Sequence, residues 1–183
     1  MIGGTKFSRW KAYLLLVGLL LTLTPFSGQA QDASQWKALV GRDRTFAAEV
    51  PGTPVYSQEA MKSPAGTPYT MNVYLLDLGG TAYAIQTSVY PPDVNVSVPK
   101  ANLQAGLDNA AKNMKDGKWT RITWVQHQGL VAVDALGIRD GLEVRNYSVM
   151  NGSQILSLTY AGPEGSGSTP QVDRFVQSLL IAR

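Results

Sequence analysis

The feature that most constrains the fold is a series of four strand-like runs in the second half of the sequence. The runs cover residues 119–128, 130–139, 142–150 and 154–160. They are separated by Gly129, by Asp140-Gly141 and by Asn151-Gly152. Asp-Gly and Asn-Gly supply the positive φ angles that two-residue hairpin turns require. The series therefore predicts an antiparallel meander.

A further hairpin is predicted in the first half of the chain. Residues 69–78 alternate between apolar and polar side chains, and residues 81–90 mirror them across Gly79-Gly80. Ahead of this hairpin, Thr45–Pro51 is typical of an edge strand stopped by proline. The proline- and glycine-rich residues 52–68 predict a loop or an irregular edge.

Three stretches have helical periodicity. They are a short lead at 33–40, a helix after Pro99 with Leu103, Leu107, Ala110 and Met114 on one stripe, and a closing helix at 171–180. Gly117 is expected to end the second helix. The order of elements predicts an α+β fold, with a mostly antiparallel central sheet of about six to seven strands sandwiched by helices. We divide the chain into residues 1–30, a short helical lead at 31–44, and one globular domain at 45–183.

Residues 1–30 have the organisation of a cleavable signal peptide. Three basic residues, Lys6, Arg9 and Lys11, precede an apolar run of eleven residues from Tyr13 to Leu23. That run is short of the roughly 20 residues needed to span a bilayer. Small side chains follow, so we predict cleavage after Ala30. An uncleaved N-terminal anchor is the alternative.

The positive net charge of the whole chain comes from residues 1–30. The whole chain has 16 basic and 13 acidic residues, a formal charge of +3. Residues 1–30 hold three of the basic residues and none of the acidic ones, so residues 31–183 are balanced. No nucleic-acid partner is therefore expected. The chain has no cysteine, which excludes disulfides, thiolate chemistry and lipoprotein anchoring, and a single histidine excludes a multi-histidine metal site.

Several segments resemble a known family. They are Phe46–Pro51, the helix of Leu103–Met114, Gly129–Val133, Tyr147–Gly152 and the closing Val172–Leu179, in which Phe175 precedes Ser178 by three positions. Together they are similar to the PsbP-like fold, which also includes a Ran-binding nuclear-import factor and bacterial envelope proteins of unknown role. The resemblance covers residues from about 45 to 183 and implies an α/β/α sandwich. It implies a binding or assembly protein without a catalytic centre, and no functional residue is carried over.

Candidate catalytic groups are few. His127, flanked by Gln126 and Gln128, is expected to be a solvated turn residue. The serines at 166 and 168 lack the spacing of a nucleophile elbow. Asp134 and Glu143 belong to a charged group with Arg139, Asp140 and Arg145, which cross-strand pairing on a solvated face explains. We therefore predict no catalytic, cofactor or metal site.

Two segments are candidates for binding. Pro92, Val94, Val96 and Val98 lie in a proline-rich crossing that could offer an apolar edge for strand addition, or could be a covered inner strand. Lys112, Lys115, Lys118 and Arg121 form a basic run that suits either a helix C-terminus or anionic headgroups. Trp119 and Trp124 are five positions apart, which in a regular strand places them on opposite faces.

The sequence favours a non-enzymatic binding or assembly protein, exported across the inner membrane and acting in the periplasm or outside a bacterial cell through contact with an unknown envelope protein. One alternative is an envelope hydrolase or isomerase that uses an unrecognised carboxylate pair. Another is a weak binder of anionic lipid or glycan through the basic run.

Overall fold

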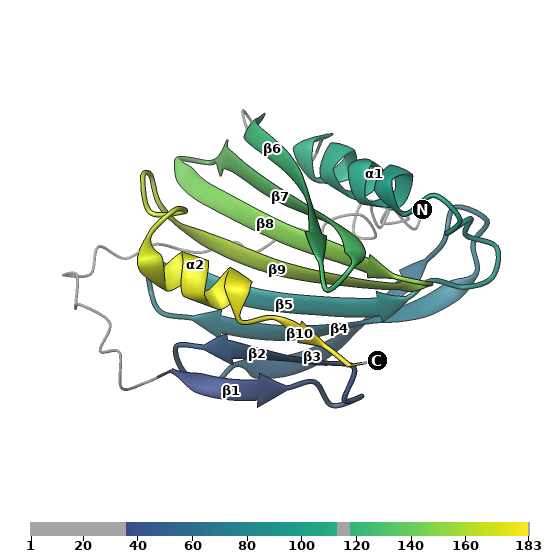
Figure 1. Cartoon of the computed structure of the whole chain (residues 1–183), viewed down its shortest axis with the longest axis horizontal. Helices are drawn as coiled ribbons and strands as arrows, with labels where there is room; N and C mark the ends of the chain where they lie inside the picture. The colour runs from purple at the N-terminus through teal and green to yellow at the C-terminus, as the bar shows by residue number, and fades with distance from the viewer. Residues whose placement is uncertain (1–35, 113–117, 183) are drawn as a thin grey trace, which may run out of the picture.

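The computed structural model describes residues 36–112 and 118–182 (Figure 1). The strands are β1 (Lys37–Val40), β2 (Phe46–Val50), β3 (Val55–Lys62), β4 (Pro68–Asp77), β5 (Ala82–Val89), β6 (Lys118–His127), β7 (Leu130–Arg139), β8 (Leu142–Asn151), β9 (Gln154–Pro163) and β10 (Leu180–Ile181). The helices are α1 (Pro99–Lys112) and α2 (Pro170–Gln177). The predicted cleavage after Ala30, the helix residue Met114, the stop at Gly117 and the basic residue Lys115 lie outside the described residues.

Most strands belong to one antiparallel sheet of seven, in the order β3-β4-β5-β9-β8-β7-β6. A three-stranded sheet, β1-β2-β10, and α2 cover one face of it, and α1 lies on the opposite face over β7 and β8 (Figure 1). This arrangement confirms the predicted α+β sandwich. In the described part of the chain, no helix is long and apolar enough to cross a membrane.

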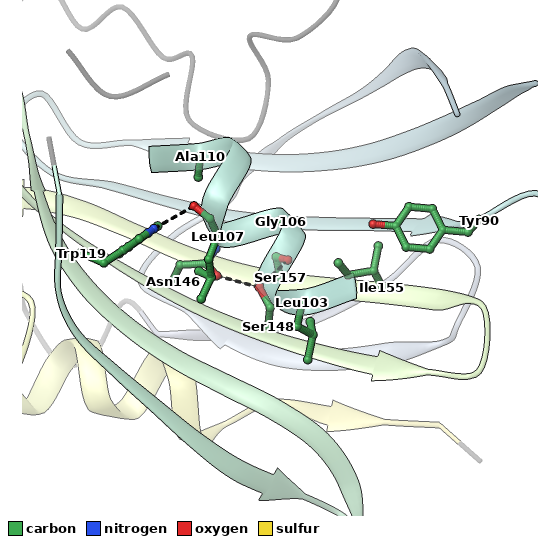
Figure 2. A pocket seen from close by; sticks show the side chains of 10 residues that line it. All are labelled: Tyr90, Leu103, Gly106, Leu107, Ala110, Trp119, Asn146, Ser148, Ile155 and Ser157. Carbon is green, nitrogen blue, oxygen red and sulfur yellow. Dashed lines mark hydrogen bonds between the residues drawn. The ribbon is translucent and has the colours of Figure 1, made fainter. Parts of the chain in front are cut away.

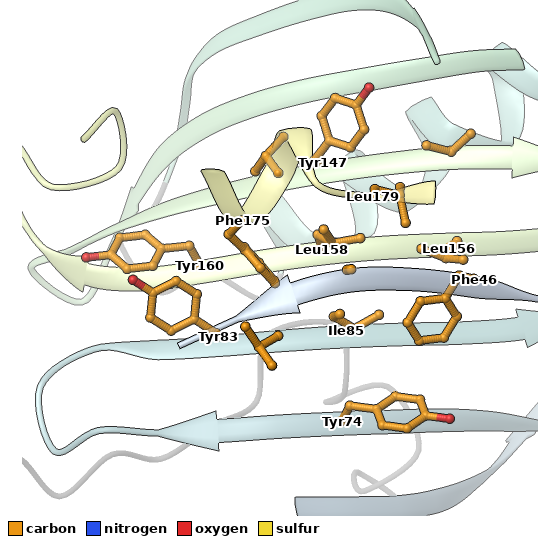
Figure 3. Close-up of a cluster of buried hydrophobic side chains, with 14 of the residues drawn as sticks. Phe46, Tyr74, Tyr83, Ile85, Tyr147, Leu156, Leu158, Tyr160, Phe175 and Leu179 are labelled. Atoms are coloured by element: carbon orange, nitrogen blue, oxygen red, sulfur yellow. The ribbon is translucent and has the colours of Figure 1, made fainter. Parts of the chain in front are cut away.

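The larger core lies between the seven-stranded sheet and the layer of β2 and α2 (Figure 3). Phe46 from β2 and Phe175 from α2 are almost fully buried there, against Ile85 and Leu158 of the sheet. Tyr83 packs edge-on against Phe175, with the ring centroids 5.2 Å apart. Burial of these aromatic rings stabilises the fold and fixes α2 on the sheet.

The predicted meander is confirmed as β6 to β9. Residues 140 and 141 form the two-residue turn between β7 and β8, with φ of 50° at Asp140 and 77° at Gly141. Gln128 and Gly129 form the turn before it, with φ of 50° and 80°. The predicted hairpin across Gly79-Gly80 is also confirmed, as β4 and β5.

The beginning of the domain differs from the prediction. The expected helix at 33–40 is wrong over its described residues, because Lys37–Val40 form β1 and pair with β2. Thr45–Pro51 is not an edge, since β2 lies between β1 and β10 and buries Phe46, Ala48 and Val50. A segment this short has too few apolar positions to distinguish the helical period from the strand period.

The expected loop at 52–68 contains the eight-residue strand β3. Pro54 and Pro64 flank β3 without entering it, and Pro68 is the first residue of β4. Proline is tolerated at these positions because it removes no hydrogen bond from the middle of the ladder. Near the C-terminus, α2 ends at Gln177, earlier than the predicted residue 180, and Leu180 enters β10.

Candidate functional site: the β6 edge

Strand β6 is the outermost strand at one end of the seven-stranded sheet, beside α1 (Figure 1). It is ten residues long, and among the described strands it pairs only with β7. A strand in this position presents one row of backbone donors and acceptors that its own sheet does not use. The β6 edge is therefore the first candidate for contact with another chain.

The hairpin turn determines which backbone groups of β6 face outward. His127 and Leu130 flank the two-residue loop of Gln128 and Gly129, so they form the hydrogen-bonded pair that closes the hairpin. Hydrogen-bonded and non-hydrogen-bonded pairs alternate along an antiparallel ladder. The N–H and C=O groups of Ile122, Trp124 and Gln126 consequently point away from β7 to the open edge.

A β-bulge changes which face the β6 side chains occupy. The pairing with β7 shifts between Trp119 and Arg121, leaving Thr120 as the extra residue. Trp119 and Trp124 both pack with the smaller core cluster under α1, so the expectation that they occupy opposite faces is wrong. The extra residue reverses the alternation that the spacing of five otherwise implies.

Both tryptophans connect β6 to α1. The indole N–H of Trp119 donates a hydrogen bond of 2.9 Å to the carbonyl oxygen of Leu107 (Figure 2). The ammonium group of Lys100 lies 4.8 Å from the ring centroid of Trp124. Gly137 on β7 allows Trp119 this position, because a Cβ added there would lie 2.9 Å from the Trp119 ring. The β6 edge is therefore held in place by the two tryptophan side chains that pack between β6 and α1.

The two faces of β6 differ in chemistry. Ile122, which is 40% exposed, shares the face of the tryptophans. Lys118 and Arg121 alternate with these residues and project from the opposite face, and both are exposed. Lys112 lies at the end of α1. The described part of the predicted basic run is thus divided between α1 and the far face of β6.

The predicted apolar edge at 91–99 has no strand conformation. Pro92, Val94, Val96 and Val98 lie in a turn-rich segment, in which the amide of Val94 donates to the carbonyl of Pro91. Val96 packs against the smaller core cluster, whereas Val98 is 55% exposed. Their use by a partner remains a prediction.

The charged group around the β7–β8 turn is only partly solvated: Asp140 is 56% exposed and pairs with Arg139, whereas the expectation of a solvated face is wrong for Arg145 and Asp134. Arg145 is buried and makes two hydrogen bonds with Asp134, from Nε at 2.9 Å and from Nη2 at 2.8 Å. Its Nη1 lies 2.5 Å from Oδ1 of Asp173. Glu143 instead accepts a hydrogen bond of 2.5 Å from the amide of Gly167. Asp134 and Glu143, two carboxylates of this group, thus have separate structural contacts.

His127 is half-buried and is not a solvated turn residue. Its Nδ1 lies 3.1 Å from the hydroxyl of Tyr147, and the two rings pack edge to face. Burial lowers the pKa of His127, while hydrogen bonding to Gln128 and to the backbone of Leu179 acts in the opposite direction. Burial likewise raises the pKa of Tyr147. This pair joins the end of β6 to the larger core.

A small cavity lies between α1 and the sheet (Figure 2). Its volume is about 30 Å³, and its polar floor consists of Asn146, Ser148 and Ser157. These side chains bond to one another, with Ser148 Oγ 2.7 Å from both Asn146 Oδ1 and Ser157 Oγ. Such a space is of the order of one or two water molecules and is too small for an organic ligand. Within 36–112 and 118–182, no three His, Asp or Glu side chains are grouped to hold a metal ion.

No protein-family model matches the sequence, and neither does any curated protein. A solved structure does. Cyanobacterial PsbP (CyanoP) from Synechocystis sp. PCC 6803 is similar with a TM-score of 0.53 and 10% sequence identity, over 86% of this chain and 98% of that chain. The chain has the PsbP-like fold.

Two further bacterial structures are similar at lower scores. A Pseudomonas aeruginosa protein of unknown function, PA94, has a TM-score of 0.42 and 13% identity, over 73% of this chain and 86% of that chain. A protein from Bacteroides thetaiotaomicron has a TM-score of 0.45 and 11% identity, over 81% of this chain and 49% of that chain. At such identities the likeness to PsbP shows the fold alone. Any function has to be argued from the residues of this PsbP-like sheet.

The sequence interpretation missed the β6 edge. A four-stranded meander has two outer strands, and the sequence does not say which one pairs elsewhere. Here β9 pairs with β5, so β6 is left outermost. The absence of Asp and Glu from residues 118–127 was the available signal, because a strand with cations and no acids is well suited to an acidic neighbour.

Proposed function

We propose that the protein is an exported, non-enzymatic binding protein of the bacterial envelope, which recognises another protein by adding one of its strands to the β6 edge. The observation that carries the proposal is the edge itself. It is a ten-residue strand at the end of a seven-stranded sheet, unpaired on its outer side among the described strands. Strand addition supplies affinity through main-chain hydrogen bonds and specificity through alternating side chains.

The chemistry of the interior supports binding over catalysis. Asp134 and Glu143 are engaged by Arg145 and by the amide of Gly167. The cavity beneath α1 is too small for a substrate. The PsbP-like fold is compatible with a role in protein contact. The division of the basic run between two surfaces makes it a less suitable site for anionic lipid or glycan.

Export is the second part of the proposal. A basic segment, an eleven-residue apolar run and small residues before Ala30 support cleavage after that residue. The remaining chain has balanced charge, so it would meet a partner through local contacts and not through long-range attraction. Intact mass of the protein recovered from the periplasm or the medium tests this part. A chain that still starts at Met1 would contradict it.

Site-specific photo-crosslinking in the native host tests the binding part. A photoreactive residue at Gln126, on the outward-facing side of β6, is expected to capture one discrete protein. The matched control is Ala60 on β3, the strand at the other end of the sheet. The amide of Ser63 donates to the carbonyl of Thr67, which makes the backbone of Ala60 face outward by the same alternation.

A proline substitution then asks whether the edge itself is required. Gln126→Pro removes only an outward-facing N–H, so the pairing of β6 with β7 is retained while a partner strand loses a donor. We expect the crosslinked product to be lost in Gln126→Pro and kept in Ala60→Pro. Equal crosslinking at both edges, or a product that survives Gln126→Pro, would argue against strand addition at β6.

A further inference from the structure

We infer that the segment bound at β6 is an extended peptide in which acidic and apolar side chains alternate. This inference rests on the strand-addition function proposed above and specifies the partner. It follows from the difference between the two faces of β6. A strand paired with β6 places successive side chains on opposite faces of the extended sheet, so each set meets a different surface.

The first set meets an apolar surface. On the face shared with α1, Ile122 is 40% exposed and lies two residues from Trp124 on the same side of the strand. Trp124 is only partly buried by its contacts with α1 and Lys100. An apolar side chain from a partner would cover these two residues and remove their apolar area from water.

The second set meets a face that is basic toward the bulge, while Thr123, Val125 and His127 continue it toward the turn. Lys118 and Arg121 project from the other face and are exposed. Neither has an ion-pair partner among the described residues. The acidic residue of β7 opposite Thr123 is Asp134, and it is already bound to Arg145. Acidic side chains of a partner would therefore neutralise cations that the described domain leaves unpaired.

The bulge and the turn limit the length of the segment. Regular pairing of β6 with β7 extends from Arg121 to His127, between the bulge at Thr120 and the turn at Gln128. Within it, three residues present outward N–H and C=O groups, at Ile122, Trp124 and Gln126. The matching segment is therefore about seven residues long along this ladder, where the cation that it meets is Arg121, and Lys118 lies beyond the bulge at the end of the segment.

A second copy of this chain matches the edge less well. Antiparallel pairing of two β6 strands keeps each face of the sheet continuous, so Lys118 and Arg121 of both copies would share one face. Because β6 contains no acidic residue, a second copy would bring no counter-charge to these cations. An acidic segment of another protein supplies that counter-charge.

Peptide binding to the purified protein tests the inference. The probe is a fluorescent heptapeptide that alternates Val and Glu. One control replaces Glu by Lys, and another has the same composition with Val and Glu in separate blocks. We expect the alternating Glu peptide to bind at least tenfold more tightly than either control, and its affinity to fall with added salt.

Variants of the protein locate the peptide. Arg121→Glu is expected to weaken the Glu peptide at least tenfold and to strengthen the Lys peptide, because the attraction is reversed. Gln126→Pro should abolish binding of the Glu peptide, whereas Ala60→Pro should leave it unchanged. Circular dichroism and urea unfolding confirm that each variant is folded before its binding is compared.

The outcomes separate this inference from the proposed function. Glu and Lys peptides of equal affinity, or no peptide binding at all, would overturn the alternating acidic segment even if the crosslink at Gln126 is found. Binding that persists in Gln126→Pro would place the peptide elsewhere. Dimerisation that Gln126→Pro abolishes would assign the edge to a second copy, and sedimentation with anionic vesicles that Arg121→Glu abolishes would assign it to a membrane surface.

Discussion

Arg145 on β8 is held by Asp134 on β7 through two parallel hydrogen bonds, with only 8% of the arginine side chain and 17% of the aspartate side chain exposed. Planar pairing of this kind matches the geometry of guanidinium and carboxylate. The remaining guanidinium nitrogen reaches Asp173 on α2 and the carbonyl of Gly167. One buried cation therefore joins the sheet, the loop after β9 and the closing helix.

Replacement of Asp134, the less exposed carboxylate partner of Arg145, should strongly reduce the free energy of unfolding. In Asp134→Asn the guanidinium stays buried without its main counter-charge, so we expect a loss of about 3–5 kcal/mol in unfolding free energy. Asp173→Asn is the matched comparison. Because Asp173 is 40% exposed, its loss should cost about 1 kcal/mol or less. Urea unfolding at neutral pH measures both values, and equal losses would contradict this view of the network.

Stability should depend on pH through His127, the single histidine of the chain. Burial lowers its pKa in the folded state below the ordinary value of 6.5, so the unfolded chain binds more protons as pH falls through that value. The contribution of His127 to stability is therefore present above pH 6.5 and is lost progressively below it.

The comparison of wild type with His127→Gln isolates this effect. The difference in unfolding free energy between the two proteins should shrink, or change in favour of the variant, between pH 7.5 and pH 5.5. Tyr147 loses its contact with the imidazole in the variant, so the two proteins are expected to differ most at the higher pH. A difference that is constant with pH would show that His127 does not titrate on unfolding in this range.

Two glycines should respond to alanine in opposite directions. Gly106 lies in the interior of α1, and a Cβ added there has no heavy atom within 4 Å, so Gly106→Ala should stabilise the protein by about 0.5–1 kcal/mol. Gly137→Ala should destabilise it, because the added Cβ would lie 2.6 Å from the Lys118 carbonyl and 2.9 Å from the Trp119 ring. Thermal unfolding of both variants gives the signs, and stabilisation by Gly137→Ala would contradict the close approach at the bulge.

The predictions that succeeded rest on local chemistry. Turn dipeptides and strict alternation identify β4 to β9, because each hairpin is specified by neighbouring residues. The failures concern β1, β3 and the solvated charges near Arg145. Those features depend on which strands pair with one another. The residues of a short run such as Lys37–Val40 do not indicate that it pairs with β2.

The candidate site shows the same limit. Periodicity alone assigns Trp119 and Trp124 to opposite faces, yet one extra residue at Thr120 brings them to the same face. Nothing in residues 118–127 identifies a bulge, since its position depends on the approach of Gly137 from β7. The sequence also does not show that β6 is an edge strand. That outcome depends on the pairing of β9 with β5, and β5 is separated from the meander by α1.

Deletion of Thr120 tests the bulge directly. Without this residue, Trp119 becomes the immediate neighbour of Arg121 and stays on the α1 face in a regular strand. Deletion of Val125 instead keeps five positions between the tryptophans and makes Trp124 the neighbour of Gln126, which moves Trp124 off the α1 face. We therefore expect the Thr120 deletion to remain folded, with both indoles shielded from acrylamide. The Val125 deletion should lose about 3–5 kcal/mol, the usual cost of removing a large aromatic side chain from a core. Exposure of an indole in the Thr120 deletion, or equal stability of the two variants, would contradict the assignment of Thr120 as the residue that aligns the two tryptophans.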